Sequence, residues 1–429
     1  MTAGSVARRE PAGAGSRDER ARQYRDVRAL TRALVDPLSA EDCVVQSMPD
    51  ASPAKWHLAH TTWFFETFVV EPGLPGYEVF HPEFRYLFNS YYNAIGAQFP
   101  RPDRGLISRP SLGEVREYRE HVDHAVAALF EGGSLDPTMD ERIELGLHHE
   151  QQHQELILTD VKHLLSANPL APVYRATSLP PAAPTPLVRW HRHPGGVLRI
   201  GYEGEGFAFD NERPRHRTLL EPFDLATRPV TNGEFLEFIE DGGYRKPELW
   251  LSEGWTTVQA QGWCAPLYWT GAAGERRMFT LSGLREVRTD EPVCHLSYYE
   301  ADAFARWAGA RLPTEAEWEA VASDVPVDGN LLDLGRLHPV PAPSGAAQSV
   351  AQLFGDVWEW TQSAYGTYPG YRLPEGALGE YNAKFMCNQL VLRGGSCATP
   401  RGHMRASYRN FFPPSARWQF SGLRLARDV

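Results

Sequence analysis

The chain has 429 residues, enough for two ordinary domains, and 42% of them are hydrophobic, enough for a sizeable core in each. The net charge of −11 and the lack of a long basic stretch argue against nucleic acid or an anionic membrane as a main partner. No apolar run approaches the roughly 18 residues of a membrane span, no signal peptide is evident, and the five cysteines lack a C-x-x-C pair, so we expect free thiols in the cytoplasm.

The first predicted helix follows a tail. Residues 1–16 show no apolar periodicity and are predicted to be disordered. From residue 17 to residue 35, apolar side chains recur at helical spacing and charged ones fill the other face, as in a bundle helix. Pro37 ends this helix because the residue before a proline avoids the α region.

A second helix is predicted to start with Ser52 as its N-cap and Pro53 in its first turn. It carries His57 and His60 and then a run of large aromatic residues. A single histidine on such an apolar face is more often a core residue than a metal ligand. Spacing alone does not decide between the two histidines.

The segment that follows, residues 84–110, is aromatic and has no clean period. A loop this long inside a compact domain is usually functional or a lid. The adjacent Tyr91 and Tyr92 could offer a phenol to an active site, or could be packing residues with surface hydroxyls. Arg101, Arg104 and Arg109 could bind a substrate carboxylate through their planar guanidinium groups, or could simply solvate the loop.

Two further helices complete the count for a four-helix bundle, in which sites form from inward side chains on facing helices. One begins at Ser111, with Glu114 as the third residue of a capping box. The other follows Pro137 and contains the run Glu144-Leu-Gly-Leu-His-His-Glu-Gln-Gln-His-Gln-Glu, whose composition favours a helix.

His149 and His153 in this run are four residues apart, so a helix stacks them on one face. Two imidazoles placed in this way can bind one divalent metal, although an amphipathic helix can also carry histidines without such a role. Gln152 lies close to the same face, and His148 is one residue off it. Glu155 points away from it and is a candidate for orienting a histidine or a neighbouring helix.

The second half of the chain has a different composition. Residues 168–186 are rich in proline and alanine and are predicted to be a linker. From 187 to 429 tryptophan, glycine and proline increase, and a few helices are expected, at 232–240, 298–308 and 314–321. A mixed domain would then follow the helical domain at 17–167, which gives an α+β fold class. No G-x-G-x-x-G motif or P-loop supports nucleotide binding.

Five runs in this second domain resemble the formylglycine-generating-enzyme (sulfatase-modifying factor) fold, an elaborated C-type-lectin-like domain. They are Arg228-Pro-Val-Thr-Asn-Gly-Glu-Phe, Arg311-Leu-Pro-Thr-Glu-Ala-Glu-Trp-Glu, Phe354-Gly-Asp-Val-Trp-Glu-Trp, Leu392-Arg-Gly-Gly-Ser and Ser421-Gly-Leu-Arg-Leu-Ala. The helical domain resembles the DinB family of four-helix bundles, which bind a metal through one histidine of the second helix and His-x-x-x-His of a later one. This order of domains resembles that of the ergothioneine sulfoxide synthases (the EgtB family) and the related ovothiol enzymes.

The resemblance implies a metal and a reaction. The family's Leu-Ala-His matches residues 58–60, which implies His60 as the third ligand, with His149 and His153, of a non-haem Fe(II). The implied activity is the O2-dependent coupling of a thiol to C2 of the imidazole of hercynine (Nα-trimethylhistidine), which yields a sulfoxide.

The substrate-binding residues are implied in the same way. Gln152 matches the family glutamine that contacts the imidazole of hercynine, and Asn410 matches the residue near its betaine end. Phe411 and Phe412 could offer aromatic faces to the trimethylammonium group, or could be core residues. Arg101 or a neighbouring arginine of the same loop is the candidate for the carboxylate of the thiol substrate.

The thiol donor is inferred from departures from the family pattern. Relatives that use γ-glutamylcysteine carry Asn-Trp-Asp where residues 410–412 read Asn-Phe-Phe, and their active-site tyrosine is expected to be missing here around residues 377–381. The run Asn89-Ser-Tyr-Tyr-Asn resembles the group that uses free cysteine. We therefore expect cysteine as the donor, with Tyr91 and Tyr92 in the site.

Several alternatives stay open at this stage. The donor could be γ-glutamylcysteine, the acceptor could be histidine itself, or the chain could be a zinc-dependent DinB-type thiol S-transferase without O2 chemistry. Thr399 and Met404 stand where the formylglycine enzymes use two cysteines to hold copper, so copper chemistry is not expected. Asp356 could join a structural Ca2+ site or could stabilise a turn. The oligomeric state does not follow from the sequence.

Overall fold

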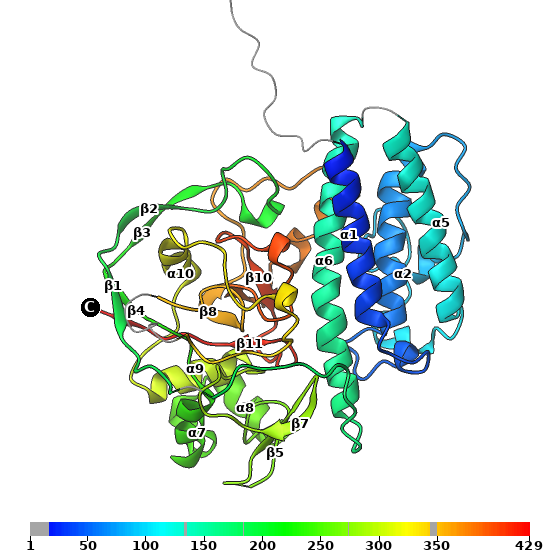
Figure 1. Ribbon diagram of the computed structural model, residues 1–429. Coiled ribbons are helices and arrows are strands. Elements are labelled where there is room, and N and C mark those ends of the chain that lie inside the picture. Colours follow the sequence, from blue (N-terminus) through cyan, green and yellow to red (C-terminus); the bar gives the residue numbers. More distant parts are fainter. Residues whose placement is uncertain (1–16, 133–134, 183, 273, 344–349) are drawn as a thin grey trace, which may run out of the picture.

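The structure is a computed structural model that describes residues 17–429 except 133–134, 183, 273 and 344–349. The predicted disordered tail, residues 1–16, lies outside the described residues. Figure 1 shows a bundle of long helices beside a broader domain of short strands and helices, with the long helix α6 (Pro137–Ser166) on the side of the bundle that faces the second domain. None of the helices in the described ranges is long and apolar enough to cross a membrane.

The helical domain contains the four predicted long helices. They are α1 Arg17–Val35, α2 Ala54–Phe65 with its π-helical continuation η2 Glu66–Val70, α5 Leu112–Glu131 and α6, with the short α3 Glu71–Gly73 and α4 Phe84–Leu87 between α2 and α5. The capping box predicted for Ser111 and Glu114 is present. The N-cap predicted at Ser52 is wrong: Pro53 occupies the N-cap position of α2 without a side-chain cap. The Ser52 hydroxyl instead accepts from Arg104, and the Ser52 N–H donates to Asp160.

A buried charge fixes the orientation of α6 within the bundle. Glu150 is fully buried and accepts from Arg28 of α1 and from Arg119 of α5. Burial alone would raise the pKa of Glu150, but Arg119 and Arg28 outweigh burial and lower the pKa to about 2. Because Glu150 directly follows His149, this ionic cluster sets the rotation of α6 about its axis and therefore the direction of its histidines.

Where the structure describes the second domain, its short strands form four small sheets. The strands are β1 Trp190–His193, β2 Gly196–Ile200, β3 His216–Leu220, β4 Phe223–Ala226, β5 Trp269–Thr270, β6 Arg277–Thr280, β7 Gly283–Glu286, β8 Trp358–Ala364, β9 Leu390–Arg393, β10 Asn410–Phe412, β11 Ser421–Gly422 and β12 Ala426–Asp428. The strand orders are β1-β4-β12, β10-β9-β8-β11, β2-β3 and β5-β6-β7. Neighbouring strands are antiparallel except for β8 and β11, which are parallel.

The helices of this domain include the three predicted ones, as α7 Asn232–Glu240, α9 Tyr298–Trp307 and α10 Glu315–Ala322. Each of these begins with a capping box, a signal that is readable in the sequence. The additional helix α8 Ser252–Gln261 has no side-chain cap at its start and was not predicted. A helical bundle followed by this mixed domain confirms the predicted α+β class.

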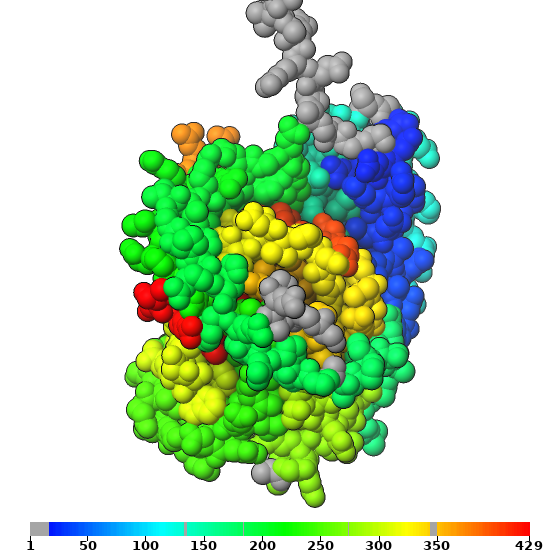
Figure 2. Space-filling model, turned by 60° about the vertical axis from the view of Figure 1, so that its left-hand side comes forward, coloured from blue at the N-terminus to red at the C-terminus, as the bar shows by residue number. Residues whose placement is uncertain are grey.

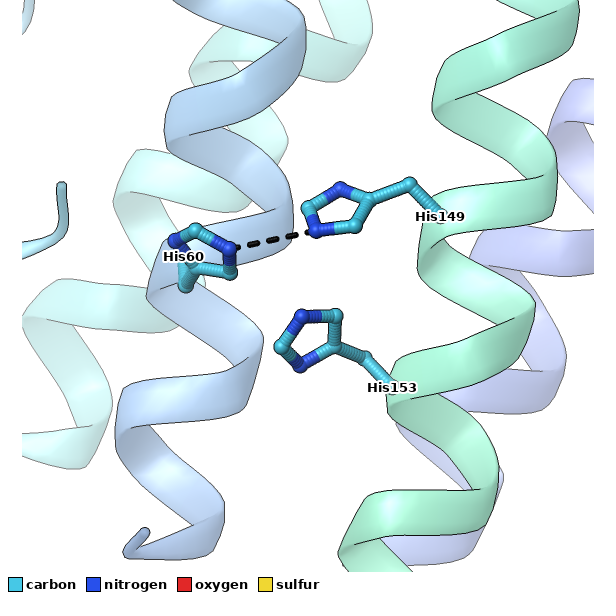
Figure 3. Close-up of side chains that lie close together, drawn as sticks. All are labelled: His60, His149 and His153. Carbon is cyan, nitrogen blue, oxygen red and sulfur yellow. Dashed lines mark hydrogen bonds between the residues drawn. The ribbon is translucent and has the colours of Figure 1, made fainter. Parts of the chain in front are cut away.

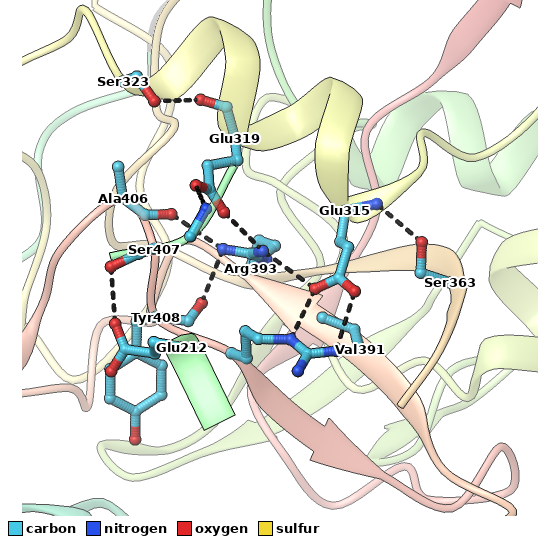
Figure 4. A network of polar contacts seen from close by, with 12 residues as sticks. Glu212, Glu315, Glu319, Ser323, Ser363, Val391, Arg393, Ala406, Ser407 and Tyr408 are labelled. Carbon is cyan, nitrogen blue, oxygen red and sulfur yellow. Dashed lines mark hydrogen bonds and ion pairs between the residues drawn. The ribbon is translucent and has the colours of Figure 1, made fainter. Parts of the chain in front are cut away.

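A buried ionic network holds the sheet segment that reaches the other domain. Arg393 of β9 is fully buried and donates to Glu315 and Glu319 of α10 (Figure 4). Arg409 also donates to Glu315. Each buried guanidinium therefore has a carboxylate partner, which is the condition under which buried charges are tolerated. Because Arg409 immediately precedes β10, this network fixes the position of the strand that carries Asn410.

One carboxylate of α6 joins the two domains. Glu155 is 7% exposed and accepts from Trp358 Nε1 at 2.7 Å, from Ser396 Oγ at 2.6 Å and from Thr399 Oγ1 at 2.8 Å. All three donors belong to the second domain, so Glu155 orients a neighbouring element and not a histidine. Helix α6 therefore packs in the bundle on one side and contacts the second domain on the other.

Candidate metal centre

Three imidazoles converge between α2 and α6. His60 comes from α2, and His149 and His153 come from successive turns of α6 (Figure 3). Their candidate ligand nitrogens all lie within 4.8 Å of one another, and His60 Nε2 is 3.2 Å from His149 Nε2. The helices approach closely here because Gly146 has no side chain: a Cβ at this position would lie 2.6 Å from the ring of Phe65.

Contacts behind the rings determine which nitrogens are free. His60 Nδ1 donates to the carbonyl oxygen of Phe88 at 2.6 Å, which leaves Nε2 without a proton. His153 Nδ1 lies 2.8 Å from His57 Nδ1, and His57 Nε2 lies 3.0 Å from Asp160 Oδ2. An ionised carboxylate only accepts, so His57 donates to Asp160 and accepts from His153, and His153 Nε2 is left free. His57 is therefore not part of the cluster but lies behind one of its members.

All three rings of the cluster are neutral. Burial lowers the pKa of His60 and of His153 well below the usual range, and the neighbouring His149 lowers both further. Burial lowers the pKa of His149 to about 3. Neutral imidazoles with free ring nitrogens are the form that binds metal, and three of them fit a divalent first-row metal while leaving positions for other ligands. In the described part of the chain no second group of this kind is found.

The cluster borders a cavity of about 560 Å³ between the two domains. The predicted site residues that line it are Tyr91, Arg101, Arg104, His149, Gln152, His153, Asn410, Phe411 and Phe412. Tyr92 lies behind Tyr91, with the two ring centroids 4.7 Å apart. Tyr92 is fully buried, and its hydroxyl has no hydrogen-bond partner among the described residues.

The two arginines that the sequence predicted for the site differ in how they are held. Arg104 is buried, lies 3.4 Å from the ring centroid of Trp56, and donates to Ser52 Oγ and Ser90 Oγ. Arg101 is exposed and donates to a backbone carbonyl. Arg104 is therefore held in place before any ligand arrives, whereas Arg101 can follow one.

Tyr381 is a site residue that sequence reasoning missed. The expectation that residues 377–381 bring no tyrosine to the site is wrong, because Tyr381 is buried and lines the cavity. Its ring centroid is 5.5 Å from that of His149, and its hydroxyl donates to Gln152 Oε1. The tyrosine itself was visible in the sequence, but its direction depends on a loop without periodicity.

This loop is held by contacts with the helical domain. It contains the short turns η8 Ala377–Glu380 and η9 Ala383–Phe385. The Glu380 carboxylate accepts from the backbone N–H groups of Asn93 and Ala94 at 3.1 and 2.8 Å. Lys384 donates to the carbonyl oxygen of Tyr91 and to Glu380. The loops that carry Tyr91 and Tyr381 therefore position each other.

The aromatic residues of β10 are half-buried and pack on other aromatic rings, Phe411 also on Phe385 with centroids 5.9 Å apart. Phe411 stacks on Tyr365 with centroids 4.0 Å apart, and Phe412 meets Trp418 edge to face at 5.9 Å. Both border the cavity and are not enclosed in the core. They are therefore available to a ligand.

Asp356 has the role of a turn-stabilising residue. Its carboxylate is buried and accepts from the Val340 N–H, from Asn330 Nδ2 and from Gln352 Nε2. Neutral donors of the protein surround both oxygens, and Asp356 has a left-handed backbone with φ of 57°. Nothing in this arrangement points to Ca2+.

Known proteins resemble both halves of the chain. The Sulfatase-modifying factor enzyme 1-like domain family matches residues 179–330 and 334–429, and the DinB superfamily matches residues 23–157. The chain is 34% identical to the hercynine oxygenase of Mycobacterium tuberculosis, over 94% of this chain and 97% of that protein. It is 36% identical to the hercynine oxygenase of Mycolicibacterium thermoresistibile, over 96% and 95% of the two chains. Ergothioneine biosynthesis protein 1 of Schizosaccharomyces pombe is 29% identical over 52% of this chain and 28% of its own length.

The pair formed by Asp160 and His57 should control metal affinity through His153. In His57→Phe the acceptor for His153 Nδ1–H is lost, and we expect the affinity for Co(II) to fall about 10–100-fold, as is typical when the hydrogen-bond partner of a metal ligand is removed. A spectroscopic titration of metal-free protein with Co(II) measures this. His163→Gln changes a half-buried histidine of the same helix that bonds to Ser47 Oγ, and should leave the affinity unchanged. Equal losses in the two variants would contradict the assignment.

Proposed function

The chain belongs to the family of the hercynine oxygenases, and from this we propose that it couples a thiol to hercynine with O2 in ergothioneine biosynthesis. The observation that carries the proposal is the cluster of three neutral imidazoles beside an interdomain cavity. Both matched domains line this cavity, so neither would form it alone.

The net reaction defines what the cavity has to do. One C–S bond and one S–O bond form; the thiol hydrogen and the hydrogen on imidazole C2 leave with one oxygen atom of O2 as water, and the other oxygen atom stays on sulfur. The cavity must therefore hold the sulfur and C2 side by side, which makes the coupling effectively unimolecular.

We infer that His60, His149 and His153 hold Fe(II) through their free ring nitrogens. Bound Fe(II) would supply the activation of O2 and would lower the pKa of a thiol in contact with it. The free His153 Nε2 and His60 Nε2 support this role, because the other nitrogen of each ring is engaged by the protein.

Hercynine and the thiol would be bound by different walls of the cavity. Gln152 presents a carbonyl oxygen that can accept the imidazole N–H, and Asn410 would lie near the betaine end. Phe411 and Phe412 offer aromatic faces to the trimethylammonium group, an interaction worth roughly 0.5–2 kcal/mol. Arg104 offers a pre-organised guanidinium to the carboxylate of the thiol substrate, and the exposed Arg101 would assist it.

Tyr381 is the best-placed proton donor. Burial, with Tyr91 nearby, raises the pKa of Tyr381 well above its usual range, so its hydroxyl keeps its proton at neutral pH. Tyr91 also lines the cavity, with its ring centroid 6.3 Å from that of Tyr381. We therefore assign proton delivery to Tyr381, with Tyr91 and Tyr92 as the packed aromatic support that holds it in position.

Free cysteine is the donor that we propose. Phe412 stands where the γ-glutamylcysteine-using relatives carry an acidic residue, and the Tyr91–Tyr92 pair resembles the cysteine-using group.

A competition between the two thiols tests this choice of donor. With hercynine and equal concentrations of cysteine and γ-glutamylcysteine, we expect Fe(II)-loaded protein to consume O2 and to form hercynylcysteine sulfoxide only, as measured by mass analysis of the products. Formation of the γ-glutamyl product would support the proposed reaction but would contradict free cysteine as the thiol donor. No O2 uptake with either thiol would favour a metal-dependent thiol S-transferase.

Removal of one hydroxyl should distinguish the tyrosines. We expect Tyr381→Phe to lose sulfoxide formation by about 10²-fold or more, the range for loss of a general acid, while cysteine is oxidised without coupling. Tyr92→Phe removes a hydroxyl that has no hydrogen-bond partner in the described ranges of the chain, and it should change the product ratio little. Mass analysis of sulfoxide and sulfinic acid products measures the ratio. Full coupling in Tyr381→Phe, with a loss in Tyr91→Phe or Tyr92→Phe, would reverse the assignment.

A further inference from the structure

A chain of hydrogen-bonded side chains leads away from the cavity across the domain interface. Gln152 Nε2 donates to Tyr408 Oη at 2.7 Å, Tyr408 Oη lies 2.8 Å from His403 Nε2, and His403 Nδ1 lies 3.1 Å from His148 Nδ1. Gln152 and His148 belong to α6, whereas Tyr408 and His403 belong to the second domain. At the far end, His148 stacks on Phe207 and borders a separate cleft of about 350 Å³.

The proton positions in this chain follow from the orientation of the Gln152 amide, whose nitrogen faces Tyr408. An amide nitrogen only donates, so Tyr408 Oη accepts from Gln152 and its own proton points to His403 Nε2. That nitrogen must then be without a proton, so a neutral His403 carries its proton on Nδ1 and donates to His148. Every donor in the chain therefore points away from the cavity, and Gln152 Oε1 is left on the side where Tyr381 donates to it.

The surroundings keep the ring of His403 neutral, as this polarity requires. Burial lowers the pKa of His403 well below its usual range, and His148 and Arg405 lower it further. Arg405 is held by Glu212, and its guanidinium carbon lies 5.1 Å from the ring centroid of Tyr408. A charged His403 would donate at both nitrogens and would compete with the Tyr408 proton.

A glutamine amide without fixed partners can exchange the places of its oxygen and nitrogen by half a turn, at little steric cost. We propose that Tyr408 and His403 are positioning residues that prevent this exchange, so that Gln152 presents its carbonyl oxygen to the ring N–H of hercynine. This role rests on the proposed function, in which hercynine supplies the imidazole. A carbonyl oxygen has two lone pairs, so Gln152 Oε1 can hold the Tyr381 hydroxyl and the substrate imidazole at one place.

The test measures hercynine binding after the chain is cut at Tyr408. Tyr408→Phe keeps the ring and removes the acceptor of Gln152, and we expect the Kd and KM of hercynine to rise about tenfold, as for one lost buried hydrogen bond. The KM of the thiol and the metal content should not change. Binding is measured by calorimetry on O2-free, Fe(II)-loaded protein. Tyr244→Phe removes a buried hydroxyl that donates to Glu300, outside the cavity, and is the matched control without effect on either KM.

Two further comparisons separate positioning from a general structural role. His403→Gln retains an acceptor for Tyr408 and should keep the hercynine Kd within about threefold, whereas His403→Leu should behave like Tyr408→Phe. In a Gln152→Leu background, Tyr408→Phe should have no additional effect on hercynine binding, because it acts through that amide.

The outcomes distinguish this role from the proposed function. An unchanged hercynine Kd in Tyr408→Phe would overturn the positioning role and leave the function intact. The same holds for an equal additional loss in the Gln152→Leu background, which would show that Tyr408 acts independently of Gln152. A failure of the unsubstituted protein to bind hercynine at all would overturn both.

Discussion

The whole site depends on α6 making three sets of contacts within two turns. Glu150 binds buried arginines of the bundle, His149 and His153 face α2, and Glu155 accepts three donors from the second domain. Because a helix is stiff over so short a distance, the two carboxylates fix the direction of the histidines between them. Buried carboxylates are tolerated only when they are fully paired, so the fold around α6 has little freedom to shift.

The sequence predicted those elements that hydrophobic periodicity or a helix-capping motif reveals. The four long helices, the spacing of His149 and His153 and the capped helices of the second domain were all visible in it. The choice of His60 needed a family resemblance, because spacing cannot show that His57 turns toward Asp160 while His60 turns toward His149. Tyr381 was missed for a related reason: its loop is placed by Glu380 and by contacts more than 280 residues away along the chain.

The two domains divide the work at the cavity. The bundle supplies the imidazoles, Gln152 and Arg104 on rigid or well-anchored elements, and the second domain supplies Tyr381 and the aromatic residues of β10. Polar contacts across the interface tie these two sets together, through Glu155, through Glu380 and through the pair of Gln152 and Tyr408. Such pre-organisation is what a coupling of two bound molecules requires, because small errors of placement cost large factors in rate.

The central claim is that a metal on three imidazoles meets both substrates in this interdomain cavity. The most direct measurement is the optical spectrum of O2-free, Co(II)-loaded protein during titration first with cysteine and then with hercynine. We expect a sulfur-to-cobalt charge-transfer band when cysteine is added and a further change of the cobalt spectrum when hercynine follows, with both lost in His153→Ala. A cobalt spectrum that responds to neither compound would contradict the claim.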